Sequence, residues 1–256
     1  MRREEVVARL RAAGVVFAED EADLLLAAPG DLEALVAARA AGEPLEPLLG
    51  WAAFDGQRVP VDPGVFVPRR RTELLAREAA HRASTGSVVV DLCCGTGAVA
   101  LAVARRVPGV VLHAADVDPA AVANARRTLE PVGGAVHGGD LLDALPDGLR
   151  GHVDVLAANA PYVPTDRIAD MPREARDFEP AVALDGGSDG LDLHRRIAEA
   201  APRWLASGGT VLIETGRTQA AWTAVLLADA GLEVEVVSDD EVDGTVAIGR
   251  RRAAGS

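Results

Sequence analysis

Apolar residues in the first part of the chain recur at helical spacing, three or four residues apart, over 3–13 and 19–40. This periodicity predicts short helices that each have one apolar face. The next segment contains Pro44 and Pro47. Each proline removes a backbone donor and biases the preceding residue away from helix. The pattern therefore predicts a small helical N-terminal domain over residues 1–48.

Residues 49–68 fit a β-hairpin that links this domain to the rest of the chain. Asp55-Gly56 is suited to the hairpin turn, and Asp62-Pro63-Gly64 is suited to a second turn. After Pro68 a helix is expected to begin near Thr72, a residue type that favours the N-cap position.

From residue 69 to residue 250, apolar runs of strand length alternate with segments of helical periodicity. The predicted strands lie near 87–92, 110–115, 134–138, 153–158, 209–214, 231–237 and 244–249. The predicted helices lie near 97–106, 119–129, 190–206 and 217–229. This alternation predicts a parallel sheet that is covered on both faces. A short acidic turn at 239–241 predicts that the last two strands are antiparallel, and the tail 251–256 is expected to be disordered.

Composition and charge narrow the choice of partners. The chain has 256 residues and a formal net charge of -13, which opposes attraction to a phosphate backbone, so a nucleic-acid substrate is disfavoured. Its two cysteines, Cys93 and Cys94, are adjacent, a spacing unsuited to a structural disulfide and without the partners of a metal site. No apolar run approaches the roughly 20 residues that a membrane span needs. We expect a metal-free, cytoplasmic protein with no membrane partner.

A glycine-bearing loop follows the first predicted strand of the alternating region. Gly95 and Gly97 allow the backbone to approach a ligand closely. In an open α/β sheet, ligands bind beyond the carboxyl ends of the strands, where this loop lies. Asp91 can accept a hydrogen bond from a cationic amine, which favours a cofactor with an α-amino group over a nucleotide phosphate. These residues indicate S-adenosyl-L-methionine.

Acidic residues also follow the next two predicted strands. Asp116 ends the second strand, next to Val117, where a carboxylate can hold both ribose hydroxyls. Asp140 follows the third strand and can reach the adenine amine, while Leu141 packs on the ring. Asp118 precedes a proline and is interpreted as a helix N-cap.

A dinucleotide-binding fold is the competing interpretation, because a glycine loop alone is weak evidence. The three-glycine fingerprint is incomplete, since Cys93 takes the first glycine place. Both cysteines are interpreted as small packing residues, with Cys93 on the loop that holds the cofactor.

A second motif, Asn159-Ala160-Pro161-Tyr162, follows the apolar strand near 153–158, whose end should face the sulfonium side of the cofactor. An amide nitrogen is a poor nucleophile, so an enzyme must orient it. The Asn159 side-chain oxygen and the Ala160 carbonyl can accept the two N–H bonds of a substrate amide. Pro161 would stiffen the turn, and Tyr162 would form a flat wall. An Asn-x-Pro turn that closes a strand is the structural alternative.

At these residues the chain resembles the HemK/PrmC family of protein-(glutamine-N5) methyltransferases, whose corresponding motif is Asn-Pro-Pro-Tyr. The resemblance spans roughly residues 40–250 and includes Ala41-Gly42-Glu43-Pro44, Val65-Phe66-Val67-Pro68-Arg69, Thr72-Glu73 and residues 179–191. It implies a Rossmann-like class I S-adenosylmethionine-dependent methyltransferase sheet of seven strands. It also implies a glutamine side chain as substrate, in a peptide release factor or a ribosomal protein.

The chain departs from the family pattern at three places. Ala160 replaces the first proline, Cys93 replaces a glycine, and Arg70-Arg71 replaces the usual Pro-Asp before Thr72. The N-terminal domain, which in the family helps to grip the protein substrate, is shortened. Two alternatives stay open: another nitrogen substrate, such as a peptide metabolite or a nucleic-acid amino group, or a cofactor-binding paralogue without catalysis. Glu214, which ends the fifth strand, is either a site residue or a sheet-end cap.

Overall fold

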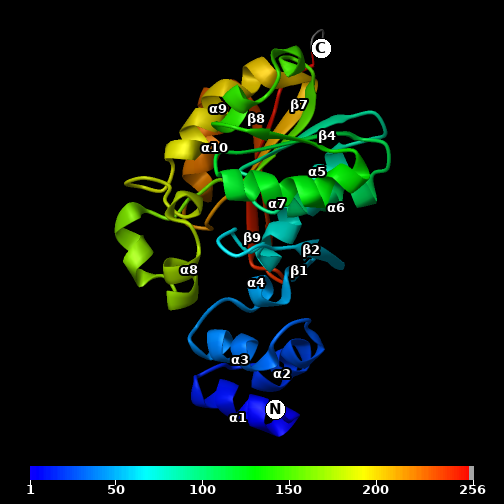
Figure 1. Ribbon diagram of the computed structural model, residues 1–256. Helices are drawn as coiled ribbons and strands as arrows, with labels where there is room; N and C mark the ends of the chain where they lie inside the picture. Colours follow the sequence, from blue (N-terminus) through cyan, green and yellow to red (C-terminus); the bar gives the residue numbers. More distant parts are fainter. Residues whose placement is uncertain (254–256) are drawn as a thin grey trace.

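Four short helices form the N-terminal part of the protein. The computed structural model describes residues 1–253. The helices are α1 (Arg3–Ala12), α2 (Ala18–Ala27), α3 (Leu32–Ala40) and α4 (Leu45–Leu49). They bury their own apolar cluster, which includes Leu10, Leu25 and Val36. Figure 1 shows α1, α2 and α3 in blue at the end of the molecule farthest from the C-terminus.

The helical pattern over 19–40 is divided between α2 and α3. Gly30 has a φ of +113, a value that L side chains rarely adopt, and it follows a proline. Asp31 then caps α3, because its side chain accepts a hydrogen bond from the Glu33 N–H (3.0 Å). The periodicity correctly predicted helix in this range, but it did not show that the range is divided into two helices at Gly30 and Asp31.

The predicted hairpin is present and leads into the larger part of the molecule. It comprises β1 (Trp51–Phe54) and β2 (Gln57–Pro60), which pair antiparallel. Asp55 and Gly56 have φ values of 50 and 72, as the tight turn between the two strands requires. The Asn124 side chain anchors the hairpin, because its Nδ2 donates to the Pro60 carbonyl (2.9 Å).

Seven strands form one mixed sheet in the order β5-β4-β3-β6-β7-β9-β8. Their bounds are β3 (Val88–Leu92), β4 (Val111–Asp116), β5 (Ala135–Gly138), β6 (Val153–Ala158), β7 (Leu205–Glu214), β8 (Glu233–Asp239) and β9 (Gly244–Arg250). The strands β3 to β7 are parallel, and β9 is antiparallel to both β7 and β8. The predicted sheet and its antiparallel last pair are confirmed. Strand order reverses between β3 and β6, which is where open α/β sheets bind ligands.

Helices cover both faces of this sheet. The α-helices are α5 (Glu73–Arg82), α6 (Ala98–Arg106), α7 (Pro119–Leu129), α8 (Arg173–Phe178), α9 (Asp192–Trp204) and α10 (Ala220–Asp229). Short 3-10 turns are η1 (Arg70–Thr72), η2 (Glu130–Val132), η3 (Leu141–Ala144), η4 (Asp147–Leu149), η5 (Thr165–Asp170) and η6 (Ala181–Ala183). The helices α5, α6 and α7 pack in one core cluster, and α9 and α10 pack in the other.

Alternation along the strands explains why they read as continuous apolar runs. Val89 and Val155 point into the first core cluster, whereas their successors Val90 and Leu156 point into the second. Both faces of the strands are therefore buried, as in other parallel sheets. Among the residues described, no helix is both long and apolar enough to cross a membrane.

Candidate active site

A cavity of about 580 Å³ opens at the carboxyl ends of the parallel strands. This volume suits a small-molecule cofactor together with part of a substrate. Its wall contains all but one of the site residues expected from sequence, namely Asp91, Cys93, Gly95, Asp116, Val117, Asp140, Leu141, Asn159, Ala160, Pro161 and Tyr162. It also contains residues that the sequence did not single out, among them Phe66, Arg71, Arg196 and residues 180–184.

The loop between β3 and α6 takes a left-handed backbone at alternate positions. Cys93, Gly95 and Gly97 have φ values of 53, 53 and 77. A side chain in this region costs about 1–2 kcal/mol, which gives a physical reason for the glycine that the family pattern has at the position of Cys93. Cys93 nevertheless keeps the turn, which is closed by the Gly97 N–H donating to the Cys94 carbonyl (2.7 Å).

Gly97, assigned to the cofactor site from sequence, lies outside the cavity wall. A Cβ atom added to it would lie 3.0 Å from Leu129 Cγ on α7. It also occupies the N-cap position of α6. Gly97 therefore allows the close approach of α6 and α7, while Gly95 lines the cavity.

The buried carboxyl group of Asp91 makes the cavity suitable for a cation. Asp91 is 1% exposed, and its Oδ2 accepts from the Ala100 N–H in the first turn of α6 (3.1 Å). Burial raises the pKa of Asp91 to about 8, and the nearby Asp116 charge adds to this. A ligand ammonium group at this carboxyl would favour its ionised form. The residues present therefore fit a cofactor that carries an α-amino group.

The Asp116 carboxylate at the end of β4 is fixed by backbone donors. Its Oδ2 accepts from the Gly95 N–H and its Oδ1 from the Asp118 N–H, both at 2.9 Å. Each oxygen keeps a second lone pair for a ligand hydroxyl. Burial raises the pKa of Asp116 as well. Asp118 caps α7 by accepting from the Ala120 N–H (2.9 Å), which confirms its interpretation as an N-cap.

Asp140, which follows β5, already has an arginine side chain as hydrogen-bond partner. Arg196 Nη2 on α9 donates to Asp140 Oδ2 (2.7 Å). Leu141 follows with a φ of 48 and lies on the cavity wall. Helical periodicity could place Arg196 on α9 but could not show that α9 approaches this loop. Within residues 1–253, no group of three or more His, Cys, Asp or Glu side chains could hold a metal ion.

Polar side chains from two further segments, η1 and the end of β7, meet the Asn159-Ala160-Pro161-Tyr162 motif. Asn159 Nδ2 donates to Thr72 Oγ1 (3.3 Å), and the Tyr162 hydroxyl donates to Glu214 Oε1 (3.3 Å). Arg71 Nε lies 3.5 Å from the same Glu214 oxygen. The helix α5 begins at Glu73, directly after Thr72, but the Thr72 hydroxyl makes no cap hydrogen bond. It faces Asn159 instead.

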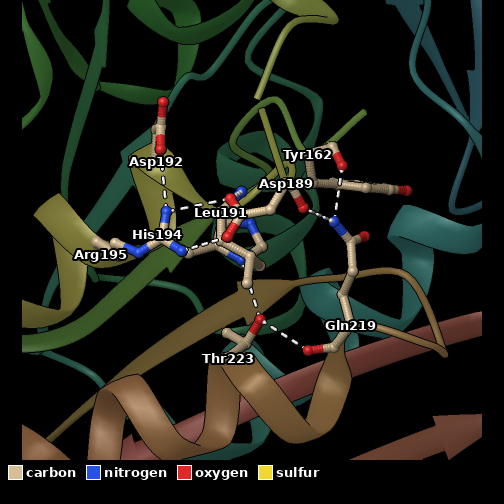
Figure 2. A network of polar contacts seen from close by, with 8 residues as sticks. All are labelled: Tyr162, Asp189, Leu191, Asp192, His194, Arg195, Gln219 and Thr223. Carbon is tan, nitrogen blue, oxygen red and sulfur yellow. Dashed lines mark hydrogen bonds and ion pairs between the residues drawn. The ribbon is translucent and has the colours of Figure 1, made fainter. Parts of the chain in front are cut away.

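The side chain of Gln219, the N-cap residue of α10, holds the backbone of this motif. Gln219 Nε2 donates to the Tyr162 carbonyl (3.0 Å) and to the Asp189 carbonyl (3.1 Å), as Figure 2 shows. In the same network His194 Nδ1 lies 3.0 Å from Thr223 Oγ1. Burial lowers the pKa of His194 to about 4, so this ring is neutral at neutral pH. Residues 179–191 are the most specific segment of the family resemblance, and their Asp189-Gly190 part packs against the backbone of Tyr162.

Gly190 leaves no room for a side chain in this packing, which gives a testable prediction. A Cβ atom there would lie 2.3 Å from the Tyr162 carbonyl oxygen. We expect Gly190→Ala to lower the free energy of unfolding by about 2–3 kcal/mol more than Gly64→Ala. Gly64 is the matched control, because its φ of +79 is close to the +76 of Gly190 and its Cβ would meet nothing within 4 Å. Urea unfolding measures both, and equal losses would contradict the packing argument.

Comparisons with known proteins give the chain a family. The model of the methyltransferase small domain matches residues 57–171. The release factor glutamine methyltransferase of Geobacter sulfurreducens is 40% identical over 188 residues, which cover 73% of this chain and 65% of that protein. The one from Mycolicibacterium smegmatis is 39% identical over 233 residues, 90% of this chain and 81% of that protein.

Two other comparisons extend this result. The 4-amino-L-phenylalanine/4-methylamino-L-phenylalanine methyltransferase of Streptomyces pristinaespiralis is 34% identical over 254 residues, 89% of this chain and 86% of that protein. Among solved structures, a methyltransferase from Pyrococcus furiosus shares the fold, with a TM-score of 0.58 and 16% identity over 77% of this chain and 90% of that one. The chain therefore belongs to the HemK/PrmC family of methyltransferases, and its cofactor is S-adenosyl-L-methionine.

Proposed function

We propose that this protein methylates the side-chain amide nitrogen of a glutamine in a protein, with a peptide release factor as the first candidate. The observation that carries this proposal is the Asn159 amide, which lies on the cavity wall and donates its N–H to Thr72. Because Nδ2 faces Thr72, Oδ1 is free to accept a hydrogen bond from a planar N–H group. The neighbouring Ala160 also lines the cavity, and we assign the role of second acceptor to its carbonyl.

These two acceptors would hold the substrate amide in one orientation. Asn159 Oδ1 and the Ala160 carbonyl each accept a hydrogen bond from one N–H of the substrate amide. The nitrogen lone pair then points out of the plane defined by the two N–H groups. When bound, S-adenosyl-L-methionine supplies an electrophilic methyl group. Tyr162 packs against the flat amide, and Pro161 stiffens the turn between the acceptors and this wall. Orientation of this kind accounts for up to about 7–11 kcal/mol of a barrier in ideal cases.

The cofactor would lie along the ends of β3, β4 and β5. We assign Asp91 to its amino group and Asp116 to its ribose hydroxyls. At the far end we assign Asp140 and Leu141 to the adenine, with Val117 packing beside it. The bends at Cys93 and Gly95 bring the backbone close to the ligand.

The nature of the protein substrate rests on the relatives. Those from Geobacter sulfurreducens and Mycolicibacterium smegmatis carry release factor in their names. We propose that the helical unit over residues 1–48 contacts this protein and that residues 69–250 carry the catalytic site. We also propose that the protein acts in the cytoplasm.

A second candidate is methylation of an amine on a small aromatic amino acid. The Streptomyces pristinaespiralis relative, named for such a substrate, is matched over 86% of its length, more than either release factor enzyme described above. The same two acceptors could hold the two N–H bonds of an arylamine. A protein glutamine and a small amine would therefore be held alike in the methyl-transfer pocket, and their contacts with the enzyme would differ only outside it.

Labelled methyl transfer tests the proposal. Calorimetric titration first establishes binding of S-adenosyl-L-methionine, and the protein is then incubated with labelled cofactor and purified release factors, ribosomal proteins or 4-aminophenylalanine. Label on a release factor glutamine supports the first candidate, with mass spectrometry of the peptide giving the position. Label only on the free amino acid would replace it with the second candidate. Cofactor binding without transfer to any of these would favour the non-catalytic interpretation.

A further inference from the structure

Strand pairing ends directly before the Asn159-Ala160-Pro161-Tyr162 motif. The last residue of β6, Ala158, is paired with Leu92 of β3 and with Ile213 of β7. The proline of the motif has no backbone N–H with which either ladder could continue. The far end of the motif is therefore held by contacts with other segments rather than by its neighbouring strands.

The connection from β7 to α10 contacts Tyr162 at both ends of this residue. At the end of β7, Glu214 Oε1 accepts from the Tyr162 hydroxyl (3.3 Å). Burial raises the pKa of Tyr162 to about 12, so the hydroxyl keeps its proton at neutral pH. A carboxyl oxygen can accept this hydrogen bond in either ionisation state of Glu214. At the start of α10, Gln219 Nε2 donates to the Tyr162 carbonyl (3.0 Å).

The Gln219 amide uses both of its donors. Its nitrogen carries two protons, and its two acceptors are the carbonyls of Tyr162 and Asp189, at 3.0 and 3.1 Å (Figure 2). The backbone of Gln219 is itself fixed, because its N–H donates to the Gly216 carbonyl (2.9 Å) and the residue caps α10. Gln219 therefore joins the backbone of Tyr162 and that of Asp189 to the start of α10.

We propose that Gln219 is a positioning residue that fixes the place of the Tyr162 ring in the cavity. Its hydrogen bond to the carbonyl fixes the peptide plane that follows Tyr162, and the contact with Glu214 fixes the far end of the ring. The ring then forms a rigid wall for a flat substrate group. The inference rests on the proposed function, because that function gives Tyr162 the role of this wall.

Gln219→Met keeps the length of the side chain and removes both donors. With the substrate that accepts the methyl group, we expect kcat to fall by roughly 3- to 10-fold, the range for loss of a neutral hydrogen bond. The Kd for S-adenosyl-L-methionine should stay within about twofold of the wild-type value. The matched control is Gln57→Met, because Gln57 is the other glutamine of the chain and lies on β2, outside the cavity wall. A wild-type kcat in Gln219→Met, or a cofactor Kd that weakens in step with kcat, would overturn the proposal.

Gly216→Ala displaces the Gln219 amide without removing it. Gly216 does not have a positive φ, so alanine suits its backbone. A Cβ atom there would lie 2.8 Å from Gln219 Oε1, and within 4 Å it would meet no other residue of the described chain apart from its chain neighbours. We expect a smaller fall in kcat than in Gln219→Met and no further loss in the double variant, because both changes disturb the same contact. If Gly216→Ala slowed Gln219→Met as much as it slows the wild type, the proposal would be wrong.

A measurement without substrate keeps this test distinct from the test of function. Tyr162 is the single tyrosine of the chain, so tyrosine labelled with carbon-13 in the ring gives signals that report on Tyr162 alone. In Gln219→Met and Gly216→Ala these signals should shift and their relaxation should show a more mobile ring, whereas Gln57→Met should match the wild type. Ring signals that stay unchanged in both variants would overturn the positioning role, even if the wild type methylates glutamine. A more mobile ring in a protein that methylates no glutamine would support the positioning of Tyr162 and contradict only the proposed function.

Discussion

In the Asn159→Ala variant we expect turnover to fall by about 10²- to 10³-fold, while the Kd for S-adenosyl-L-methionine stays within about twofold of the wild-type value. The variant removes an acceptor that orients the substrate amide, and a nitrogen that can rotate spends little time with its lone pair directed at the methyl group. The Asn159 contact with Thr72 lies on the side of Asn159 away from that acceptor. Single-turnover transfer of labelled methyl and calorimetry of cofactor binding measure the two quantities separately.

Two controls give this experiment a clear outcome. Asn159→Gln keeps the amide but moves it by one methylene, so it should be almost as slow as Asn159→Ala if position matters. Thr128 is a buried threonine on α7 outside the cavity wall, so the Thr128→Val variant should turn over at the wild-type rate. If cofactor affinity and turnover fall by the same factor in Asn159→Ala, the residue holds the cofactor, and the proposed role as substrate acceptor is wrong.

The Asp91→Asn variant is expected to bind S-adenosyl-L-methionine about 10- to 100-fold more weakly and yet to be more stable than wild type at about pH 8. The loss of affinity corresponds to one charge-assisted hydrogen bond of about 1.5–3 kcal/mol. The gain in stability has a different origin: Asp91 is buried next to Asp116, and no cationic side chain within residues 1–253 offsets its charge. Its Oδ2 accepts from Ala100, a contact that an asparagine oxygen can keep.

The pH dependence of this stability has a definite sign. The pKa of Asp91 is raised from 3.8 to about 8 in the folded protein. The stabilising contribution of the protonated carboxyl is therefore complete below about pH 4 and is lost as the pH rises toward 8. Asparagine is neutral throughout, so the variant should gain about 1–3 kcal/mol over wild type near pH 8 and little near pH 4. Thermal unfolding at both pH values measures the difference, and an equal gain at both would contradict the raised pKa.

Cofactor binding should also release a proton from Asp91. At about pH 7 the carboxyl of the free protein is mostly protonated, and the ligand ammonium group would convert it to the carboxylate. Calorimetry in buffers of different ionisation enthalpy should detect this release for S-adenosyl-L-methionine. It should be absent for 5′-methylthioadenosine, which lacks the amino acid part, and in Asp91→Asn. Equal proton release with both ligands would place the ammonium group elsewhere in the cavity.

The fold and the cofactor loop could be predicted from sequence because they depend on local patterns. Buried strands such as β3 are mostly apolar, with Val88, Val89 and Val90 in succession, and the acidic turn before β9 marked the antiparallel pair. The ends of parallel strands converge at one edge of a sheet, so Asp91, Asp116 and Asn159 could be grouped without knowledge of the contacts. The Asp118 cap also follows from local sequence, since its acceptor and donor are two residues apart.

The partners of the site residues were decided only by tertiary structure. Thr72 has the sequence position of an N-cap, but in the folded protein its hydroxyl accepts from Asn159, 87 residues away along the chain. Glu214 and Arg196 became parts of the cavity wall through the packing of β7 and α9, whose periodicity indicates buried faces but not the loops that they meet. Periodicity reports which face of an element is buried. Which polar groups then meet depends on how distant elements pack, and that is determined by the burial of the whole sheet.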